Sequence, residues 1–198
     1  MKTALFFLKC LCTLLLMTTI ACAEWQSSNG PIRDKWTGVL LNPPKGWRIG
    51  EAWTVGSPYG RYEIRREPTE VQAEPGSPEW EKAWLLASRC HVTITPLPRY
   101  EDEQENQQYI GKFRDPAFLD QLKQKWSERG EVVSAERFIR GSIVEVKIVV
   151  DAKDIHFMRV YLASNKNIVD IYCGESQSSF KARQPPYDAV VQGVTLPE

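Results

Sequence analysis

The chain has 198 residues, which is long enough for one domain with a real hydrophobic core and leaves little room for a second domain. Charged residues (25%) and hydrophobic residues (42%) occur in the proportions of a soluble globular protein. The 25 basic residues balance the 25 acidic ones, so net charge gives no reason to expect nucleic acid or an anionic membrane surface as a partner.

The start of the chain has the features of a secretory signal peptide. Lys2 and Lys9 accompany an apolar run over residues 11–20, and Ala-Cys-Ala follows at 21–23. A basic start, a short apolar stretch and a small-residue cleavage site indicate a signal peptide over residues 1–23 rather than a membrane span. Its removal would leave 23 basic residues against 25 acidic ones and deliver a soluble chain to the periplasm.

A lipid anchor is the alternative for the same segment. Thr19-Ile20-Ala21-Cys22 resembles the box that precedes the lipidated cysteine of bacterial lipoproteins, although Thr19 stands where a leucine-like residue is usual. In this alternative Cys22 carries acyl chains and ties the protein to the envelope, which is the one case in which we expect membrane contact. Both alternatives place the protein in a Gram-negative envelope.

Two cysteines, Cys90 and Cys173, remain beyond this leader. In an oxidising compartment the pair predicts a disulfide between the strand near His91 and the last strand of the C-terminal half. Because it closes a long loop, the bridge would stabilise the fold by roughly 4 kcal/mol in the chain-entropy model. Two buried thiols are an alternative. Zinc ligation together with His91 and His156 is disfavoured, because zinc-ligand spacing is missing and adjacent strand residues point to opposite faces, so we expect no metal and no cofactor.

The N-terminal part of the mature chain gives short, interrupted signals. Residues 24–35 are polar and are expected to form a flexible segment, followed by a single α+β domain over residues 36–197. A first strand is expected over Trp36–Leu41, ended by the proline-rich turn at residues 42–46, and a second over Arg61–Arg66.

The next segments are less uniform. Three prolines mark residues 68–78 as a surface loop. Residues 80–87 have helical spacing, whereas residues 85–94 could equally form one long strand, and His91–Thr95 alternates as a strand does. The acidic stretch over residues 101–106 lacks the spacing of a calcium loop and is interpreted as a solvated loop or a first helical turn.

The strongest helix signal lies between Asp115 and Gly130. Asp115 can cap a helix, Pro116 suits its first position, and Gly130 follows the last turn. The apolar residues form one stripe, as in a helix laid on a sheet: Phe118, Leu119, Leu122 and Trp126.

Residues 131–173 predict an antiparallel meander. Apolar and polar residues alternate with a period of two along three segments that polar turns separate. The apolar stripes are Val144, Val146, Ile148 and Val150, then Met158, Val160 and Leu162, then Val169, Ile171 and Cys173. A short amphipathic helix is expected from Tyr187 onward, packing back on the sheet through Val190, Val191 and Val194.

Catalytic motifs are missing from the sequence. The two histidines, His91 and His156, both fall in expected strands, and there is no G-x-S-x-G, H-E-x-x-H or Gly-rich phosphate loop. We therefore expect no enzyme. The alternative is a cell-wall or lipid-directed hydrolase that uses carboxylates in a cleft of the sheet.

Three features together resemble the PsbP-like and DcrB-like family of secreted domains. They are N-P-P-K-G-W at residues 42–47, the amphipathic helix followed by the meander, and the ending I-Y-C-G-E-S at 171–176 with F-K-A-R-x-P-P-Y-D-A-V-V at 180–191. The resemblance covers residues 36–197 and implies an antiparallel sheet between helical layers, in domains that usually bind or assemble rather than catalyse. The matched positions are turn and core positions, so the resemblance assigns no functional residue.

These observations predict a non-catalytic periplasmic domain that binds another protein, either a secreted toxin or an envelope component. A sharper version is an immunity protein that neutralises a toxin delivered into the periplasm, and a lipidated structural component is a further alternative. Loop aromatics are typical anchors of such contacts. The candidates are Trp53, Tyr59, Trp80 and Tyr100, each of which could instead pack beneath the long loops.

Overall fold

The computed structural model describes residues 27–52, 60–67, 77–79, 88–97, 103–177, 180 and 186–197. The expected signal peptide, the lipidation alternative at Cys22 and the ambiguous segment at residues 80–87 lie outside these ranges. In the part of the chain that is described, no helix combines the length and the apolar character needed to cross a membrane.

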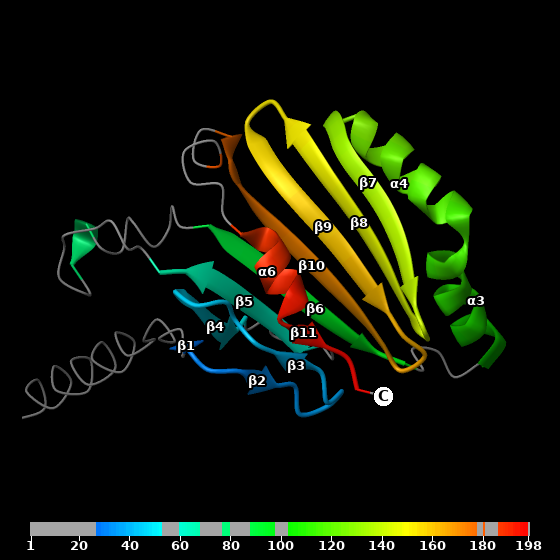
Figure 1. Ribbon diagram of the computed structural model, residues 1–198, viewed down its shortest axis with the longest axis horizontal. Helices are drawn as coiled ribbons and strands as arrows, with labels where there is room; N and C mark the ends of the chain where they lie inside the picture. The colour runs from blue at the N-terminus through cyan, green and yellow to red at the C-terminus, as the bar shows by residue number, and fades with distance from the viewer. Residues whose placement is uncertain are drawn as a thin grey trace, which may run out of the picture.

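Eight antiparallel strands form the main sheet (Figure 1). Across the sheet they run in the order β1 (Ser27–Ser28), β4 (Trp47–Glu51), β5 (Gly60–Arg66), β6 (Arg89–Pro96), β10 (Asn167–Ser176), β9 (Ile155–Ala163), β8 (Ile143–Ala152) and β7 (Gly130–Arg140). The expected meander is confirmed as β7 to β10, and the strands expected over residues 61–66 and 91–95 are confirmed within β5 and β6. The pairing of β6 with β10 is the seam between the two halves of the chain.

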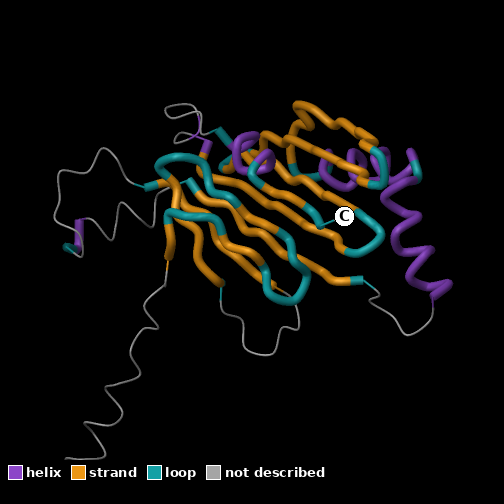
Figure 2. Tube along the Cα trace, turned by 60° about the horizontal axis from the view of Figure 1, so that its bottom comes forward, coloured by secondary structure: helices purple, strands orange, loops and turns teal. Residues whose placement is uncertain are grey.

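Other elements cover both faces of this sheet. On one face lie α6 (Tyr187–Gln192) and a small sheet in the order β11 (Val194–Thr195), β3 (Leu40–Leu41) and β2 (Ile32–Arg33); we call it the small-sheet face. On the other, the two-helix face, lie α3 (Glu103–Arg114) and α4 (Pro116–Ser127), which gather toward the β7 end of the sheet (Figures 1 and 2). The expected α+β class with an antiparallel sheet is therefore confirmed. The expected helical layers are α3 and α4 on one face, whereas on the other face α6 shares the cover with the small sheet.

The apolar stripes of the meander point to different faces. In β8, Val146 belongs to the stripe that packs against Leu122 and Trp126 of α4. In β9 and β10, the stripes of Val160 and Ile171 pack instead with the residues of the small sheet. The period of two is confirmed, and the sheet buries apolar side chains on both of its faces.

The opposite side of β8 is polar as a result. Glu145 and Lys147 face the small-sheet side, where they lie directly opposite Leu162 and Val160 of β9. Charged side chains thus adjoin core residues on one face of a continuous sheet. This strip of β8 becomes the floor of the groove described below.

Two expectations for the N-terminal part are wrong. The segment 24–35, expected to be flexible, contains β1, which pairs with β4, and β2, which pairs with β3. Asp34 in this segment is buried and accepts a hydrogen bond of 2.6 Å from the hydroxyl of Tyr62 in β5. The strand expected over residues 36–41 shrinks to its last two residues, because Asp34 accepts the backbone N–H groups of Trp36 and Thr37 and holds them in a turn.

The helical layer holds one helix that was expected in full and one of which only the first turn was expected, as an alternative. Asp115 caps α4 by accepting the N–H of Ala117 at 2.9 Å, and Pro116 begins the helix. α3 starts in the acidic stretch, which confirms the helical alternative there, but it continues for 12 residues. Glu128 is the C-cap of α4, and Gly130, two residues later, begins β7. A Cβ atom at Gly130 would lie 2.4 Å from the carbonyl oxygen of Asp151, so the close pairing with β8 requires glycine there.

Candidate functional site

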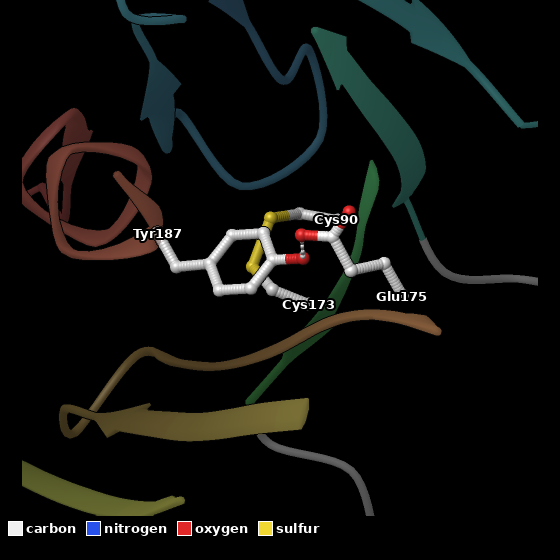
Figure 3. The surroundings of a disulfide bond; sticks show 4 residues. All are labelled: Cys90, Cys173, Glu175 and Tyr187. Atoms are coloured by element: carbon white, nitrogen blue, oxygen red, sulfur yellow. Dashed lines mark hydrogen bonds between the residues drawn. A yellow bond between two sulfur atoms is a disulfide. The ribbon is translucent and has the colours of Figure 1, made fainter. Parts of the chain in front are cut away.

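Cys90 of β6 and Cys173 of β10 form a disulfide across the seam, which confirms the expected bridge (Figure 3). Both side chains are fully buried on the small-sheet face. Their sulfur atoms are bonded to each other and are thus not free to ligate zinc. Among the described residues, no group of three or more His, Cys, Asp or Glu side chains is placed to hold a metal ion.

A buried carboxylate, Glu175, lies beside the disulfide and accepts a hydrogen bond from Tyr187 (Figure 3). It accepts a second one from the hydroxyl of Ser88. Tyr187 of α6 donates to one oxygen at 3.0 Å, and Ser88 donates to the other at 3.1 Å. Burial raises the pKa of the Tyr187 phenol, and the negative charge of Glu175 raises it further. The bond from Tyr187 attaches α6 to the end of β10, and the bond from Ser88 joins the same carboxylate to the residue that precedes β6.

The residue types of a serine hydrolase meet at this end of the sheet without forming a catalytic triad. Glu175 lies opposite His156 of β9, which contacts Asp151 of β8 and stacks on Phe180 with ring centroids 3.4 Å apart. Ser88, however, adjoins β10 on its other side and donates to Glu175. With strands about 4.8 Å apart, roughly 10 Å separates its strand from that of His156, too far for a base to activate the hydroxyl.

His91 lies on the opposite, two-helix face. It lines a cavity of about 310 Å³ together with Arg89 and Tyr172. Burial lowers the pKa of His91, Glu63 acts in the opposite direction, and Arg89 lowers the pKa again. Because the pairing of β6, β10 and β9 turns His91 and His156 to opposite faces, the two imidazoles cannot serve one metal or one substrate.

A groove of about 450 Å³ opens on the small-sheet face between α6 and the β7–β8 hairpin. The polar side of β8 and the neighbouring residues of β7 form its floor, and α6 with the chain that follows it forms its wall. These elements are far apart in sequence, so the groove exists only because α6 folds back over the meander.

The groove carries charges of both signs. Lys147 of β8 crosses it to Asp188 of α6, with Nζ and Oδ1 2.6 Å apart. The Lys147 side chain is 19% exposed and that of Asp188 is 67% exposed, so the ion pair runs from the floor to the solvent. Glu136 of β7 lies directly opposite Lys147, and Glu145 and Arg140 complete the charged lining.

Apolar side chains lie between these charges. Leu162 and Leu196 are almost fully buried at the base of the groove, and Val191 contributes from α6. Phe138 of β7 stands at the rim, opposite Glu145, and is 43% exposed. Apolar residues surrounded by charges resemble the make-up of protein–protein contact surfaces.

β7 also carries most of the exposed large apolar side chains in the described ranges. These are Val133, Phe138 and Ile139 on β7, and Trp36 in the turn after β2. Trp36 is 75% exposed, with Nζ of Lys35 5.2 Å from its ring centroid. Phe138 and Ile139 lie on opposite faces of β7, so Phe138 is the exposed apolar side chain of this strand that belongs to the groove.

The four aromatic candidates taken from the sequence, Trp53, Tyr59, Trp80 and Tyr100, lie outside the described residues. The groove residues were not singled out from the sequence. One signal could have found Phe138: Phe138 and Ile139 are adjacent in a strand and therefore point to opposite faces. Both can be buried only if both faces are covered, which is rare for an edge strand.

Comparison with known proteins adds a structural similarity. No protein-family model matches the chain, and no curated protein matches it. Among solved structures, it is similar to the solution structure of cyanobacterial PsbP (CyanoP) from Synechocystis sp. PCC 6803, with 12% identity and a TM-score of 0.45 over 90% of this chain and 96% of that chain. Like the sequence resemblance, this similarity concerns the fold and not the molecules that the chain binds.

Proposed function

We propose that this chain is a non-catalytic protein of the Gram-negative periplasm that binds another protein through the groove between α6 and the β7–β8 hairpin. The observation that supports this most is the make-up of the groove. Apolar side chains at its base are ringed by the charges of Glu136, Arg140, Glu145, Lys147 and Asp188. A partly exposed aromatic side chain, Phe138, stands at its rim, and aromatic residues are enriched at protein interfaces.

The partner that fits this groove is a protein segment with an apolar side chain flanked by charged ones. An apolar side chain would reach Leu162 and Leu196, while flanking charges would meet Glu145 on one side and Arg140 on the other. Lys147 is already held by Asp188, so the groove offers a partly satisfied charge pattern rather than a single strong charge. Such a pattern favours specific binding of one partner over non-specific binding of many.

The sharper form of the proposal is an immunity protein that neutralises a toxin delivered into the periplasm. The disulfide, together with the signal peptide and the single domain expected from the sequence, suits a protein that must survive outside the cytoplasm. Neutralisation would follow if the bound segment of the toxin belonged to its active-site region.

Affinity capture from the native cell envelope tests this function. The tagged protein would be compared with two variants that place the same bulky residue on a helix: Gln192→Trp at the groove wall and Gln124→Trp on the exposed side of α4. One stoichiometric partner that is lost with Gln192→Trp and kept with Gln124→Trp supports the proposal. An empty capture, repeated with crosslinking, contradicts it.

The immunity form needs a further result. The captured partner should carry an enzymatic activity that the wild-type protein inhibits at a ratio of one to one and that Gln192→Trp inhibits less. A partner whose activity is unaffected would leave protein binding standing and remove the immunity role.

The hydrolase alternative keeps one specific observation in its favour. The groove is a cleft on the sheet, and Glu136, Glu145 and Asp188 bring three carboxylates to it. Turnover of a cell-wall or lipid substrate by the purified protein, abolished by Glu145→Gln, would replace the binding proposal. The lipidated structural alternative is tested separately by intact mass, because acyl chains on Cys22 would add to it.

A further inference from the structure

β7 is one of the two edge strands of the described sheet, at the edge that the C-terminal meander forms. It is 11 residues long, and only β8 pairs with it there. An edge strand presents a row of backbone N–H and C=O groups that have no partner in the sheet, and natural proteins usually protect such an edge. β7 has such protection in its first part, where a bulge lies between Val132 and Ser134. Beyond the bulge it exposes Phe138 and Ile139, which are 43% and 59% exposed.

The end of β7 is complementary to itself. Glu136, Phe138 and Arg140 share the small-sheet face, where all three line the groove. If two such strands pair antiparallel with Phe138 opposite Phe138, Glu136 of each copy lies opposite Arg140 of the other. Residues that are directly opposite in an antiparallel pair have side chains on the same side and about 5 Å apart, so both ion pairs can form.

Two other symmetric registers of the same strand bring like charges together. Centring the pair on Glu136 places two carboxylates opposite each other, and centring it on Arg137 places two guanidinium groups opposite each other. Like charges directly opposite destabilise a strand pair. The register centred on Phe138 avoids both and joins the two exposed aromatic rings.

We propose that β7 pairs with β7 of a second copy of this chain, in the antiparallel register centred on Phe138. The eight-stranded sheets of the two copies then continue into each other, and α4 remains on the two-helix face of each. Each copy brings its Phe138 and Arg140 to the mouth of the other's groove, so the two grooves meet at the twofold axis. The pairing does not depend on the protein-binding function proposed above.

The same strand limits the assembly to a dimer. A bulge between Val132 and Ser134 breaks the regular ladder, so that pairing is confined to the far end of β7. The other edge strand of the described sheet, β1, has two residues and offers no comparable ladder. An interface that pairs one edge with itself is closed by its twofold axis and does not propagate.

Contact through about five residue pairs is small, so we expect a dissociation constant on the order of 10–100 µM. Sedimentation velocity over a concentration series of the exported protein measures this directly. Mass that rises from monomer to dimer over this range supports the proposal, and a monomer at every concentration overturns it.

Charge reversal tests the register. Glu136→Arg alone and Arg140→Glu alone each place like charges opposite each other in the homodimer, and each should weaken dimerisation about tenfold or more. A mixture of the two single variants should dimerise, because each Arg then faces a Glu, and the double variant should regain wild-type behaviour. Failure of both the mixture and the double variant to dimerise would overturn this register.

A cysteine at the centre gives a second, independent readout. Phe138→Cys places two thiols opposite each other at a separation that suits a disulfide, and mild oxidation should give a covalent dimer. Val133→Cys is the matched control, because it is exposed on the same strand but lies far from its counterpart in the other copy. Equal crosslinking of the two variants would contradict the proposal.

Discussion

Cys90 and Cys173 lie directly opposite each other on β6 and β10, with their Cα atoms 4.0 Å apart although the two residues are 83 positions apart in sequence. Their disulfide spans the one strand pair that joins the N-terminal strands to the C-terminal meander. It therefore ties together covalently, at one position of their register, two strands that are also paired along eight residues.

Removal of this bridge should cost more stability than any other change at the seam. In the chain-entropy model a loop of this length corresponds to about 4 kcal/mol of unfolding free energy, and the double variant Cys90→Ala, Cys173→Ala should lose this amount. Urea denaturation of the oxidised protein and the variant measures it. Dithiothreitol should destabilise the wild type and leave the variant unchanged; equal sensitivity of the two would contradict the account.

Asp34 should make the stability of the protein depend on acid pH. Burial would raise the pKa of its carboxyl group, but hydrogen bonds from Thr37, Tyr62 and the backbone of Trp36 outweigh burial and hold the pKa below its usual 3.8. A folded pKa below the unfolded one means that the contribution is complete above the unfolded value and is lost as the pH falls through the folded one.

Asp34→Asn tests this linkage. It should lower the unfolding free energy by about 2 kcal/mol at pH 7, because a charged acceptor of four hydrogen bonds is lost. The difference from wild type should narrow as the pH is lowered from 5 toward 3. Denaturant titrations at several pH values check this, and a difference that stays constant or widens would be inconsistent with it.

Tyr187 should stabilise the protein through its bond to Glu175. Tyr187→Phe keeps the ring, which packs edge-on against Trp47 with centroids 6.5 Å apart, and removes one donor from a buried carboxylate. We expect a loss of about 1–3 kcal/mol by thermal or urea unfolding. In a Glu175→Met background the same change should cost much less, and equal costs in both backgrounds would show that the hydroxyl acts elsewhere.

Arg137 should hold the end of α3. Its Nε donates to the carbonyl oxygen of Phe113 at 3.4 Å, and its terminal nitrogen Nη2 donates to the carbonyl oxygen of Arg114. A cationic side chain of β7 thus caps the C-terminus of α3. Arg137→Met should cost about 1–2 kcal/mol and speed amide hydrogen exchange over residues 103–114. Arg140→Met, on the other face of the strand, serves as the control and should leave that exchange unchanged.

The strands of the meander were predictable because their signal is local. A period of two can be read along each segment, and the structure keeps the stripes of β8, β9 and β10 as the sequence indicates them. The orientation of one stripe relative to the next was not readable. That Val146 faces α4 while Val160 faces the small sheet depends on what covers each face, and those covering elements lie elsewhere in the chain.

The elements that were missed or misplaced depend on partners rather than on their own sequence. β1 and β2 are two residues long and exist through their pairing with β4 and β3. α3 buries only three of its side chains, Asn106, Ile110 and Phe113, so its stripe is too sparse to indicate a helix.

The candidate groove could not be predicted from the sequence, because its residues come from segments that are far apart in the chain. Lys147 and Asp188 are 41 positions apart and meet because Tyr187 and Glu175 fix α6 on the sheet. The charged residues of β7 and β8 alone look like an ordinary solvated strand face, since charges on the polar side of a hairpin are common. That strand face becomes the floor of a groove because α6 packs beside it and forms the wall.

Site-specific photocrosslinking in living cells tests the central claim most directly. A photoreactive residue would replace Gln192 at the groove wall and, as the matched control, Gln124 on α4. The account predicts one discrete crosslinked protein of the cell envelope from position 192 and none from position 124. No product from position 192, or the same products from both positions, would contradict the claim that this groove binds a protein partner.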